Sequence, residues 1–384
     1  MITKNTRNPV FVIAPDSFKG SLSAKEVCDS IERGIKKILP DAECIKVPMA
    51  DGGEGTVQSL VDATNGTIYH TQVSDPLGRK IKAMYGISGD GSTAFIEMAS
   101  ASGLYLLTEN ERNPLLTSTY GTGQLVKAAL DKNVKKIILG IGGSATNDGG
   151  AGFAQALGVK LLDKEGDELP FGGKYLKKLS KIDISNIDAR LKDIEFEAAC
   201  DVTNPLCGKN GASAVFGPQK GAAPAMVELL DESLLHYSQI IEEQLQRSVC
   251  DIPGAGAVGG LGAGLLAFTN TRLSKGIDMV IEYTRLKEII KKADFVITGE
   301  GGMDRQTLYG KTPFGVARIA KDKKKKVIAI TGYIGKGIDE LYKNGFDAIF
   351  GIVPYPMTLD KALQTGKENI ERTVENIVRL LSIS

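Results

Sequence analysis

The chain has 384 residues, a formal net charge of +1, no tryptophan and only 6% aromatic residues. Its length predicts two or three domains, and a balanced charge with few aromatic side chains argues against a nucleic-acid partner. No apolar run is long enough to cross a bilayer and the first residues carry no apolar signal stretch, so we expect a cytoplasmic protein without a membrane partner. Five scattered cysteines and two histidines argue against a zinc site and against histidine-based catalysis, which leaves carboxylates and lysines.

One pattern recurs along the chain: a short apolar strand is followed by a loop rich in Gly, Asp, Ser or Asn. Strands are predicted at 10–14, 45–49, 137–140, 196–199, 295–298 and 327–331. Helices are predicted at 24–39, 56–64, 123–131, 151–157, 228–248 and 359–381. The first helix opens with the capping-box pair Ser23 and Glu26. This alternation predicts an α/β protein with largely parallel sheets, whose ligands bind beyond the carboxyl ends of the strands.

The domain organisation follows from where this pattern is regular. Both ends of the chain show clean βα units, whereas 73–97 shows short extended pieces separated by turns, which predicts some antiparallel structure. We therefore expect a discontinuous α/β domain built from 1–80 and 285–384. Residues 81–284 would be inserted into it as a second, mixed α/β domain, and two consecutive domains are the alternative.

The loop after predicted strand 137–140 is the most informative segment, because it contains four further glycines between 142 and 150. Glycine lets a ligand approach the backbone closely, and the N–H groups of such a loop and of the following helix form an anion cradle. Ser144 and Thr146 add hydroxyl donors, and Asp148 adds a carboxylate of the kind that holds hydrated Mg²⁺. Together they predict a phosphate ligand; the alternative is a plain βα turn.

Two familiar nucleotide motifs match only in part. Gly310-Lys311-Thr312 is like the end of a P-loop, but Arg305 stands where the first glycine is required. Gly254-Ala-Gly256-Ala-Val-Gly259 matches GxGxxG literally, although Ile252-Pro253 rather than a convincing strand precedes it. This match keeps an NAD(P)-dependent hydroxy-acid oxidoreductase as one alternative function. A non-catalytic regulator that binds phosphometabolites is another.

Six segments, taken in order, carry a resemblance to a known family. They are APDSFKGS (14–21), ADGGEGT (50–56), GGSATNDGG (142–150), CDVTNPL (200–206), PQKGA (218–222) and TGEGGMD (298–304). With these segments the chain resembles the type-I glycerate kinase family over nearly its whole length. Gly302 departs from the pattern, since many members are expected to have an arginine there. The resemblance implies ATP-dependent phosphorylation of D-glycerate, with 2-phosphoglycerate favoured over 3-phosphoglycerate, and a flavodoxin-like domain with an inserted domain.

Phosphoryl transfer to glycerate needs a phosphate cradle, a metal held by carboxylates, a nearby cation and a base. We therefore expect ATP and Mg²⁺ as cofactors and D-glycerate as the small-molecule substrate. The candidate catalytic residues are Asp201, Asp148 and Lys19, with Asp148 and Asp201 also candidate metal ligands. The candidate substrate-binding residues are Asp16, Ser17, Lys19 and Arg79. The candidate phosphate-binding residues are Gly142, Gly143, Ser144, Thr146, Asn147 and Glu300, and the further candidates are Asp51, Glu54 and Asp304.

Each of these assignments has a structural alternative. Asp201 directly follows predicted strand 196–199, where a catalytic group is expected, but it is also suited to cap a turn. Lys19 is equally a solvated lysine before a helix, and Arg79 equally ends a hairpin. Glu54, Glu300 and Asp304 are equally suited to complement a helix dipole. If the functional assignments hold, the loops that carry these residues converge on one site.

Overall fold

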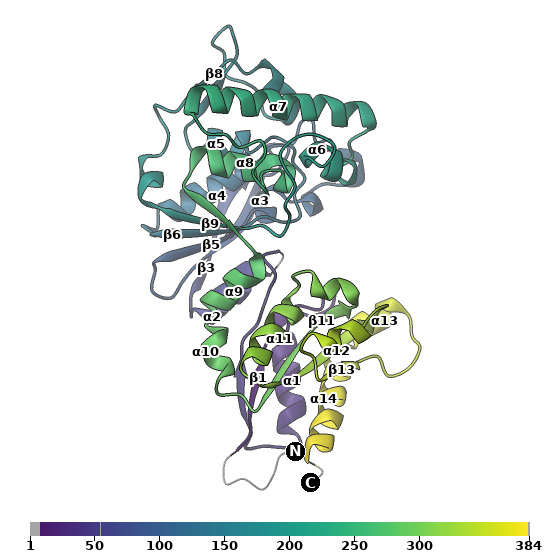
Figure 1. The fold of residues 1–384 in the computed structure, drawn as a ribbon. Coiled ribbons are helices and arrows are strands. Elements are labelled where there is room, and N and C mark those ends of the chain that lie inside the picture. Colours follow the sequence, from purple (N-terminus) through teal and green to yellow (C-terminus); the bar gives the residue numbers. More distant parts are fainter. Residues whose placement is uncertain (1–7, 54, 383–384) are drawn as a thin grey trace. The chain divides into compact units, whose positions relative to one another are not determined.

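In this computed structural model, residues 8–53 and 55–382 are described, and the chain divides into two compact units (Figure 1). The terminal unit consists of Met1–Asp51, Gln58–Thr64 and Ile277–Ser384. The inserted unit consists of Gly52–Val57 and Asn65–Gly276. Each unit has a sheet of its own, and no described helix is both long and apolar enough to cross a membrane.

The terminal unit contains a five-stranded, wholly parallel sheet. Its strands are β1 (Val10–Ile13), β2 (Glu43–Lys46), β11 (Phe295–Met303), β12 (Lys326–Ile334) and β13 (Ala348–Gly351). They lie in the order β13-β12-β11-β1-β2. Counted along the chain and from the other edge, this order is 2-1-3-4-5, the flavodoxin-like order. The chain leaves β1 in one direction and returns past it to β11, so the topological switch point lies between these two strands.

Helices cover both faces of this sheet. They are α1 (Ala24–Lys36), α2 (Thr56–Ala63), α9 (Gly276–Tyr283), α10 (Leu286–Ile290), α11 (Thr312–Asp322), α12 (Asp339–Lys343), α13 (Leu359–Gln364) and α14 (Gly366–Ser382). The predicted capping box of α1 is present, with Ser23 and Glu26 bonded reciprocally. A Cβ at Gly34 would stand 2.8 Å from the backbone oxygen of Glu371, so glycine is what lets α1 and α14 approach so closely.

The inserted unit contains a six-stranded mixed sheet. Its strands are β3 (Thr67–Ser74), β4 (Lys80–Ile87), β5 (Thr93–Glu97), β6 (Lys136–Gly140), β9 (Glu195–Ala199) and β10 (Thr271–Ser274). The order is β10-β9-β6-β5-β4-β3, antiparallel from β3 to β5 and parallel from β5 to β10. The predicted antiparallel region is therefore present, and the α/β class with a large insertion is confirmed.

The remaining elements of the inserted unit are mostly helical. They are α3 (Ala99–Ser102), α4 (Tyr120–Leu130), α5 (Ala151–Ala156), α6 (Ala212–Phe216), α7 (Pro224–Leu245), α8 (Ala257–Phe268) and a separate hairpin of β7 (Lys160–Leu162) and β8 (Lys181–Asp183). Residues buried beneath them include Phe153, Leu234 and Tyr237. This core is distinct from the one under α1 and α14 in the terminal unit.

Three boundaries differ from those expected from the sequence. Strand β3 pairs with β4 over its whole length, so 65–80 belong to the inserted unit, and 277–284 belong to the terminal unit. The second strand ends at Lys46, although Val47 and Met49 still donate backbone hydrogen bonds to Ile13 and Pro15. The predicted helix 359–381 is two helices, because the chain turns at Thr365 before α14 begins.

Candidate functional site

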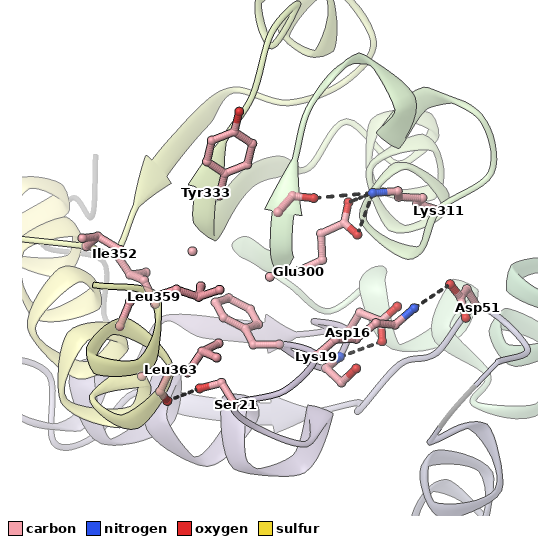
Figure 2. A pocket seen from close by; sticks show the side chains of 18 residues that line it. Asp16, Lys19, Ser21, Asp51, Glu300, Lys311, Tyr333, Ile352, Leu359 and Leu363 are labelled. Atoms are coloured by element: carbon pink, nitrogen blue, oxygen red, sulfur yellow. Dashed lines mark hydrogen bonds and ion pairs between the residues drawn. The ribbon is translucent and has the colours of Figure 1, made fainter. Parts of the chain in front are cut away.

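A pocket of about 370 Å³ opens where β1 and β11 end in the terminal unit (Figure 2). Every residue that lines it belongs to this unit. Its charged lining residues are Asp16, Lys19, Asp51, Glu300 and Lys311, and its apolar ones include Phe18, Tyr333, Ile352, Val353, Leu359 and Leu363. Figure 2 shows the charged side chains gathered at one end and the leucines and Ile352 at the other. The pocket thus lies at the switch point, where doubly wound α/β proteins bind ligands.

Asp16 is the most perturbed carboxylate of this pocket. It follows β1, and its side chain is 6% exposed. One carboxylate oxygen accepts the backbone N–H of Ser17 at 2.6 Å, and the other accepts the hydroxyl of Thr312 at 2.7 Å. Burial, and then the nearby charge of Asp51, raise the pKa of the Asp16 carboxyl from 3.8 to about 6. This value is close to neutral pH, which suits a proton acceptor.

Glu300 and Lys311 form the second charged group. The Lys311 ammonium lies 3.3 Å from a Glu300 oxygen, and Thr307 donates its hydroxyl to Glu300 at 2.9 Å. Burial raises the pKa of Glu300, and the charge of Lys311 opposes that shift. Glu300 stands on the paired backbone of β11 and β12, whereas Lys311 is the residue that precedes α11. The arrangement places a cation and a carboxylate together.

The other predicted residues of these loops lie around the same pocket. Lys19 and Asp51 form a long ion pair of 3.9 Å, with Lys19 largely exposed, and Ser17 lines the wall beside them. Asp304 instead caps the turn that follows β11, since its carboxylate accepts the backbone N–H of Gln306 at 2.7 Å. Glu54 lies outside the described residues.

The glycine-rich loop 142–150 lies in the inserted unit, and most of it is buried. Gly142 and Gly143 remain accessible at its tip, whereas Ser144, Thr146 and Asn147 are buried. Ser144 accepts a hydrogen bond from Lys220, and the Asn147 amide donates to Ser213 at 2.8 Å. Ser144 and the Asn147 amide nitrogen are thus bonded within the protein, whereas the Thr146 hydroxyl and the Asn147 side-chain oxygen are buried without a hydrogen-bond partner among the described residues.

Asp148, which the sequence assigned to a metal ion and to catalysis, is bound by the backbone donors that were expected to hold a ligand anion. Its carboxylate accepts the backbone N–H groups of Gly150 and Gly152 at 3.2 Å each, at the start of α5. It also accepts the backbone N–H and the hydroxyl of Thr119 at 2.8 and 2.9 Å. Burial raises the pKa of Asp148, and these bonds oppose that shift. The donors of the predicted cradle therefore bind the chain's own carboxylate.

Lys220 is a buried cation that the sequence reasoning did not single out. Its ammonium donates to the Ser144 hydroxyl at 2.7 Å and to the Thr146 backbone oxygen at 2.6 Å, and the side chain is 2% exposed. Burial lowers the pKa of Lys220 from 10.5 to about 7, against the attraction of Asp148. Lys220 thus holds the glycine-rich loop from inside the inserted unit.

The Lys220 pKa predicts a pH-dependent stability. Between about pH 7 and 10.5 the unfolded chain keeps the Lys220 proton and the folded protein does not. The free energy of unfolding therefore rises as the pH increases from 7 to 10.5, and the protein is less stable below pH 7 than above this range. From pH 7 to pH 9 the gain amounts to about 2 kcal/mol, because Lys220 is still half protonated in the folded protein at pH 7. Denaturant unfolding at both pH values should show this gain in the wild type and not in Lys220→Met. Equal gains in both proteins would contradict the assignment.

Asp201 and Arg79 lie in the inserted unit with defined partners. Asp201 is exposed after β9, and its carboxylate accepts the backbone N–H of Gly276, the first residue of α9, at 3.1 Å. Arg79 donates to Asp75 and to Glu111, the latter at 2.6 Å, and so closes the turn before β4. These contacts are compatible with the structural alternatives for both residues. They do not test the catalytic and substrate-binding assignments, which stay predictions.

Comparison with known proteins identifies the family. A family model described as "Glycerate kinase family" matches residues 11–382. A relative from Escherichia coli (strain K12) named "Glycerate 2-kinase" is 52% identical, covering 97% of this chain and 98% of its own. A "Glycerate kinase" from Halalkalibacterium halodurans is 54% identical over 95% and 96%. The chain belongs to the glycerate kinase family. A solved structure from Salmonella typhimurium LT2, described as "putative glycerate kinase 2", superposes with a TM-score of 0.90 at 50% identity, covering 98% of both chains.

The segment that matches GxGxxG does not form a dinucleotide-binding unit, which agrees with membership of the glycerate kinase family. Residues 246–253, which lead into it, contain no strand. A Cβ at Gly259 would stand 2.0 Å from the backbone oxygen of Thr146, and one at Gly260 would stand 2.8 Å from Gly149. These glycines therefore let α8 pack against the glycine-rich loop, and no βαβ dinucleotide unit is formed.

Several residues that line the pocket of this glycerate kinase family member were not predicted as site residues from the sequence. Lys311 and Thr312 belong to the triplet Gly310-Lys311-Thr312, which the sequence suggested only as part of a P-loop. In the structure Lys311 forms an ion pair with Glu300, and the Thr312 hydroxyl donates to Asp16. The apolar wall gave no local signal, since its residues are spread from Phe18 to Leu363.

The predicted loops divide between the units: 16–20 and 299–304 border the pocket, and 142–150 and 201–204 belong to the inserted unit. Their convergence on one site stays a prediction.

Proposed function

We propose that the protein transfers the γ-phosphoryl group of ATP to the 2-hydroxyl of D-glycerate, giving 2-phosphoglycerate and ADP. Family membership and full-length relatives named glycerate kinase support the reaction, and the name of the Escherichia coli relative supports the 2-position. The structural observation that carries the proposal is the pocket at the switch point, where carboxylates and lysines stand together. Phosphoryl transfer relies on such positioning and charge neutralisation.

Asp16 is our candidate for the general base. In the proposed step the glycerate oxygen bonds to the γ-phosphorus, its proton passes to the Asp16 carboxylate, and the bond to the leaving ADP oxygen breaks. The pKa of about 6 keeps Asp16 ionised at neutral pH while leaving it basic enough to accept the proton. Lys311 and Lys19 border the same space and supply positive charge toward the phosphates.

Mg²⁺ is the metal that this chemistry calls for, and the donor set fits it. Mg²⁺ prefers oxygen ligands and is commonly held by one or two carboxylates together with substrate phosphates. Among residues 8–53 and 55–382 no group of three or more His, Cys, Asp or Glu is placed to hold a metal by itself. Asp51, which also lines the pocket, would hold the ion together with the substrate phosphates, which leaves Asp16 as the proton acceptor. When bound, Mg²⁺ neutralises charge on the phosphate oxygens.

The inserted unit receives a revised assignment. We propose that Asp148 is structural, because both of its oxygens already accept hydrogen bonds within a buried site. Of the loop 142–150, the accessible tip of Gly142 and Gly143 remains the candidate phosphate contact. Arg79 and Asp201 remain candidates for the substrate and for catalysis.

The test is an assay of the purified protein with D-glycerate and MgATP. We expect ADP release that depends on D-glycerate, and a product whose phosphorus couples to the C2 proton in a proton–phosphorus NMR correlation. Coupling to the C3 protons would instead identify 3-phosphoglycerate and refute the 2-position. A protein that releases no ADP in response to D-glycerate would refute the kinase proposal as a whole.

A further inference from the structure

The pocket of the terminal unit has an apolar half that the chemistry of glycerate does not require. Tyr333, Ile352, Val353, Leu359 and Leu363 line it, and Figure 2 shows Ile352, Leu359 and Leu363 at the end away from the charged residues. Two of these side chains are strongly exposed, Tyr333 at 64% and Leu359 at 73%. Glycerate is a small acid with two hydroxyl groups and no apolar face, so it gains nothing from such a wall. The wall suits a ligand with an aromatic or apolar part.

We propose that this wall is the nucleoside subsite, where the adenosine of ATP binds with its phosphates directed toward Asp16, Glu300 and Lys311. The inference rests on the proposed function for its use of ATP. In that reaction the adenine ring is the aromatic component of the substrates. The pocket volume of about 370 Å³ falls within the range of small-molecule sites.

The position of Tyr333 makes it the stacking residue of this subsite. It pairs with Gly302 in the register of β11 and β12, and its backbone oxygen accepts the Thr331 hydroxyl at 2.9 Å. A Cβ at Gly302 would stand 3.6 Å from the Tyr333 ring, so the glycine leaves the ring uncovered by a neighbouring side chain. Base–aromatic stacking is tolerant of the base, because every base has a π-face.

The opposite side of the wall is held in place by the C-terminal helices. Leu359 is the first residue of α13, whose cap is Thr358. The Ser21 hydroxyl donates to the Leu363 backbone oxygen at 2.5 Å, and so ties α13 to the loop after β1. Gly301, Gly302 and Gly332 also line the pocket and add no side chain to it. A nucleotide that spans the pocket therefore meets apolar side chains first and the ion pair of Glu300 and Lys311 last.

The experiment compares two ligands that share the phosphates and differ in the nucleoside. Calorimetry would measure the binding of MgATP and of magnesium tripolyphosphate to the wild type, Tyr333→Ala and Leu359→Ser. We expect the affinity for MgATP to fall about tenfold in each variant, while the affinity for tripolyphosphate stays unchanged. Tyr333→Phe keeps the ring and should bind MgATP like the wild type.

Matched controls come from side chains of similar exposure outside the pocket. Tyr355 is 60% exposed and Leu380 is 62% exposed, and neither lines the pocket. Tyr355→Ala and Leu380→Ser should leave both affinities unchanged. Melting temperatures of all variants should match the wild type, because every substituted side chain is largely exposed.

Two results would overturn the inference. Unchanged MgATP binding in Tyr333→Ala and Leu359→Ser would show that the nucleoside binds elsewhere. A higher KM for D-glycerate with unchanged MgATP binding would assign the pocket to the acceptor. The outcome is separable from that of the proposed function: weaker MgATP binding in both variants would support the subsite even in a protein that does not phosphorylate glycerate.

Discussion

Replacing Asp16 with Asn is expected to lower kcat by roughly 10²-fold or more and to stabilise the protein at pH 7. Asparagine keeps the shape and can bond to Ser17 and Thr312, but it cannot accept the glycerate proton. Stability rises because the wild-type carboxylate is ionised at pH 7 in a buried site. Steady-state kinetics and thermal melting on the same preparations would measure both effects.

The sign of the stability change follows from the raised pKa. The folded protein binds the Asp16 proton up to about pH 6 and the unfolded chain only up to 3.8, so Asp16 stabilises the fold at low pH and this stabilisation is lost as the pH rises through 6. Above pH 6 the ionised group costs about 3 kcal/mol. The advantage of Asp16→Asn should therefore be present at pH 7 and vanish toward pH 4.

The pH–rate profile supplies a second readout. In the wild type, kcat/KM should fall as the pH drops through about 6, because Asp16 becomes protonated. Asp51→Asn removes a negative charge that helps to raise the Asp16 pKa, so the acid limb should move to lower pH. Asp304→Asn is the matched control, since Asp304 caps a turn and does not line the pocket. An acid limb that stays in place in Asp16→Asn would contradict the base assignment.

The fold was predictable because its signals are local. Alternating apolar strands and helices identified strands of both sheets, although the edge strands β10 and β13 were not predicted, and the Ser23 and Glu26 pair marked the first turn of α1. The domain boundary near residue 80 was harder to predict, because β3 belongs to the inserted unit through its pairing with β4 and not through its own sequence. An alternating apolar pattern predicts a strand but does not predict the sheet to which that strand belongs.

The glycine-rich loop shows why site residues are harder to predict. Gly, Ser, Thr and Asp in this spacing are the groups that a phosphate cradle needs, but the same donors can bind a carboxylate of the chain. Which of the two occurs depends on Thr119, which lies 29 positions before Asp148 and closes the site around it. Lys220 reaches the loop from 76 positions beyond Ser144. Such long-range contacts leave no periodicity in the sequence.

Asp201→Asn is the substitution that separates catalysis from capping in the inserted unit. The Asp201 carboxylate accepts the backbone N–H of Gly276, and an asparagine side-chain oxygen can accept the same bond. Asparagine and aspartate cap helix starts about equally well, so the melting temperature should change little. If the protein needs the negative charge of Asp201 for catalysis, as we predict, kcat falls by roughly 10²-fold.

Asp201→Ala is the companion variant, because it removes both the charge and the hydrogen-bond acceptor. It should lose about 1 kcal/mol of stability in addition to the activity lost by Asp201→Asn, which is the ordinary cost of a missing cap. An Asp201→Asn enzyme with near wild-type kcat would show that Asp201 only caps α9. Asp16 would then stand as the carboxylate that carries the chemistry. A fall in kcat at unchanged melting temperature would instead show that a carboxylate of each unit contributes to turnover.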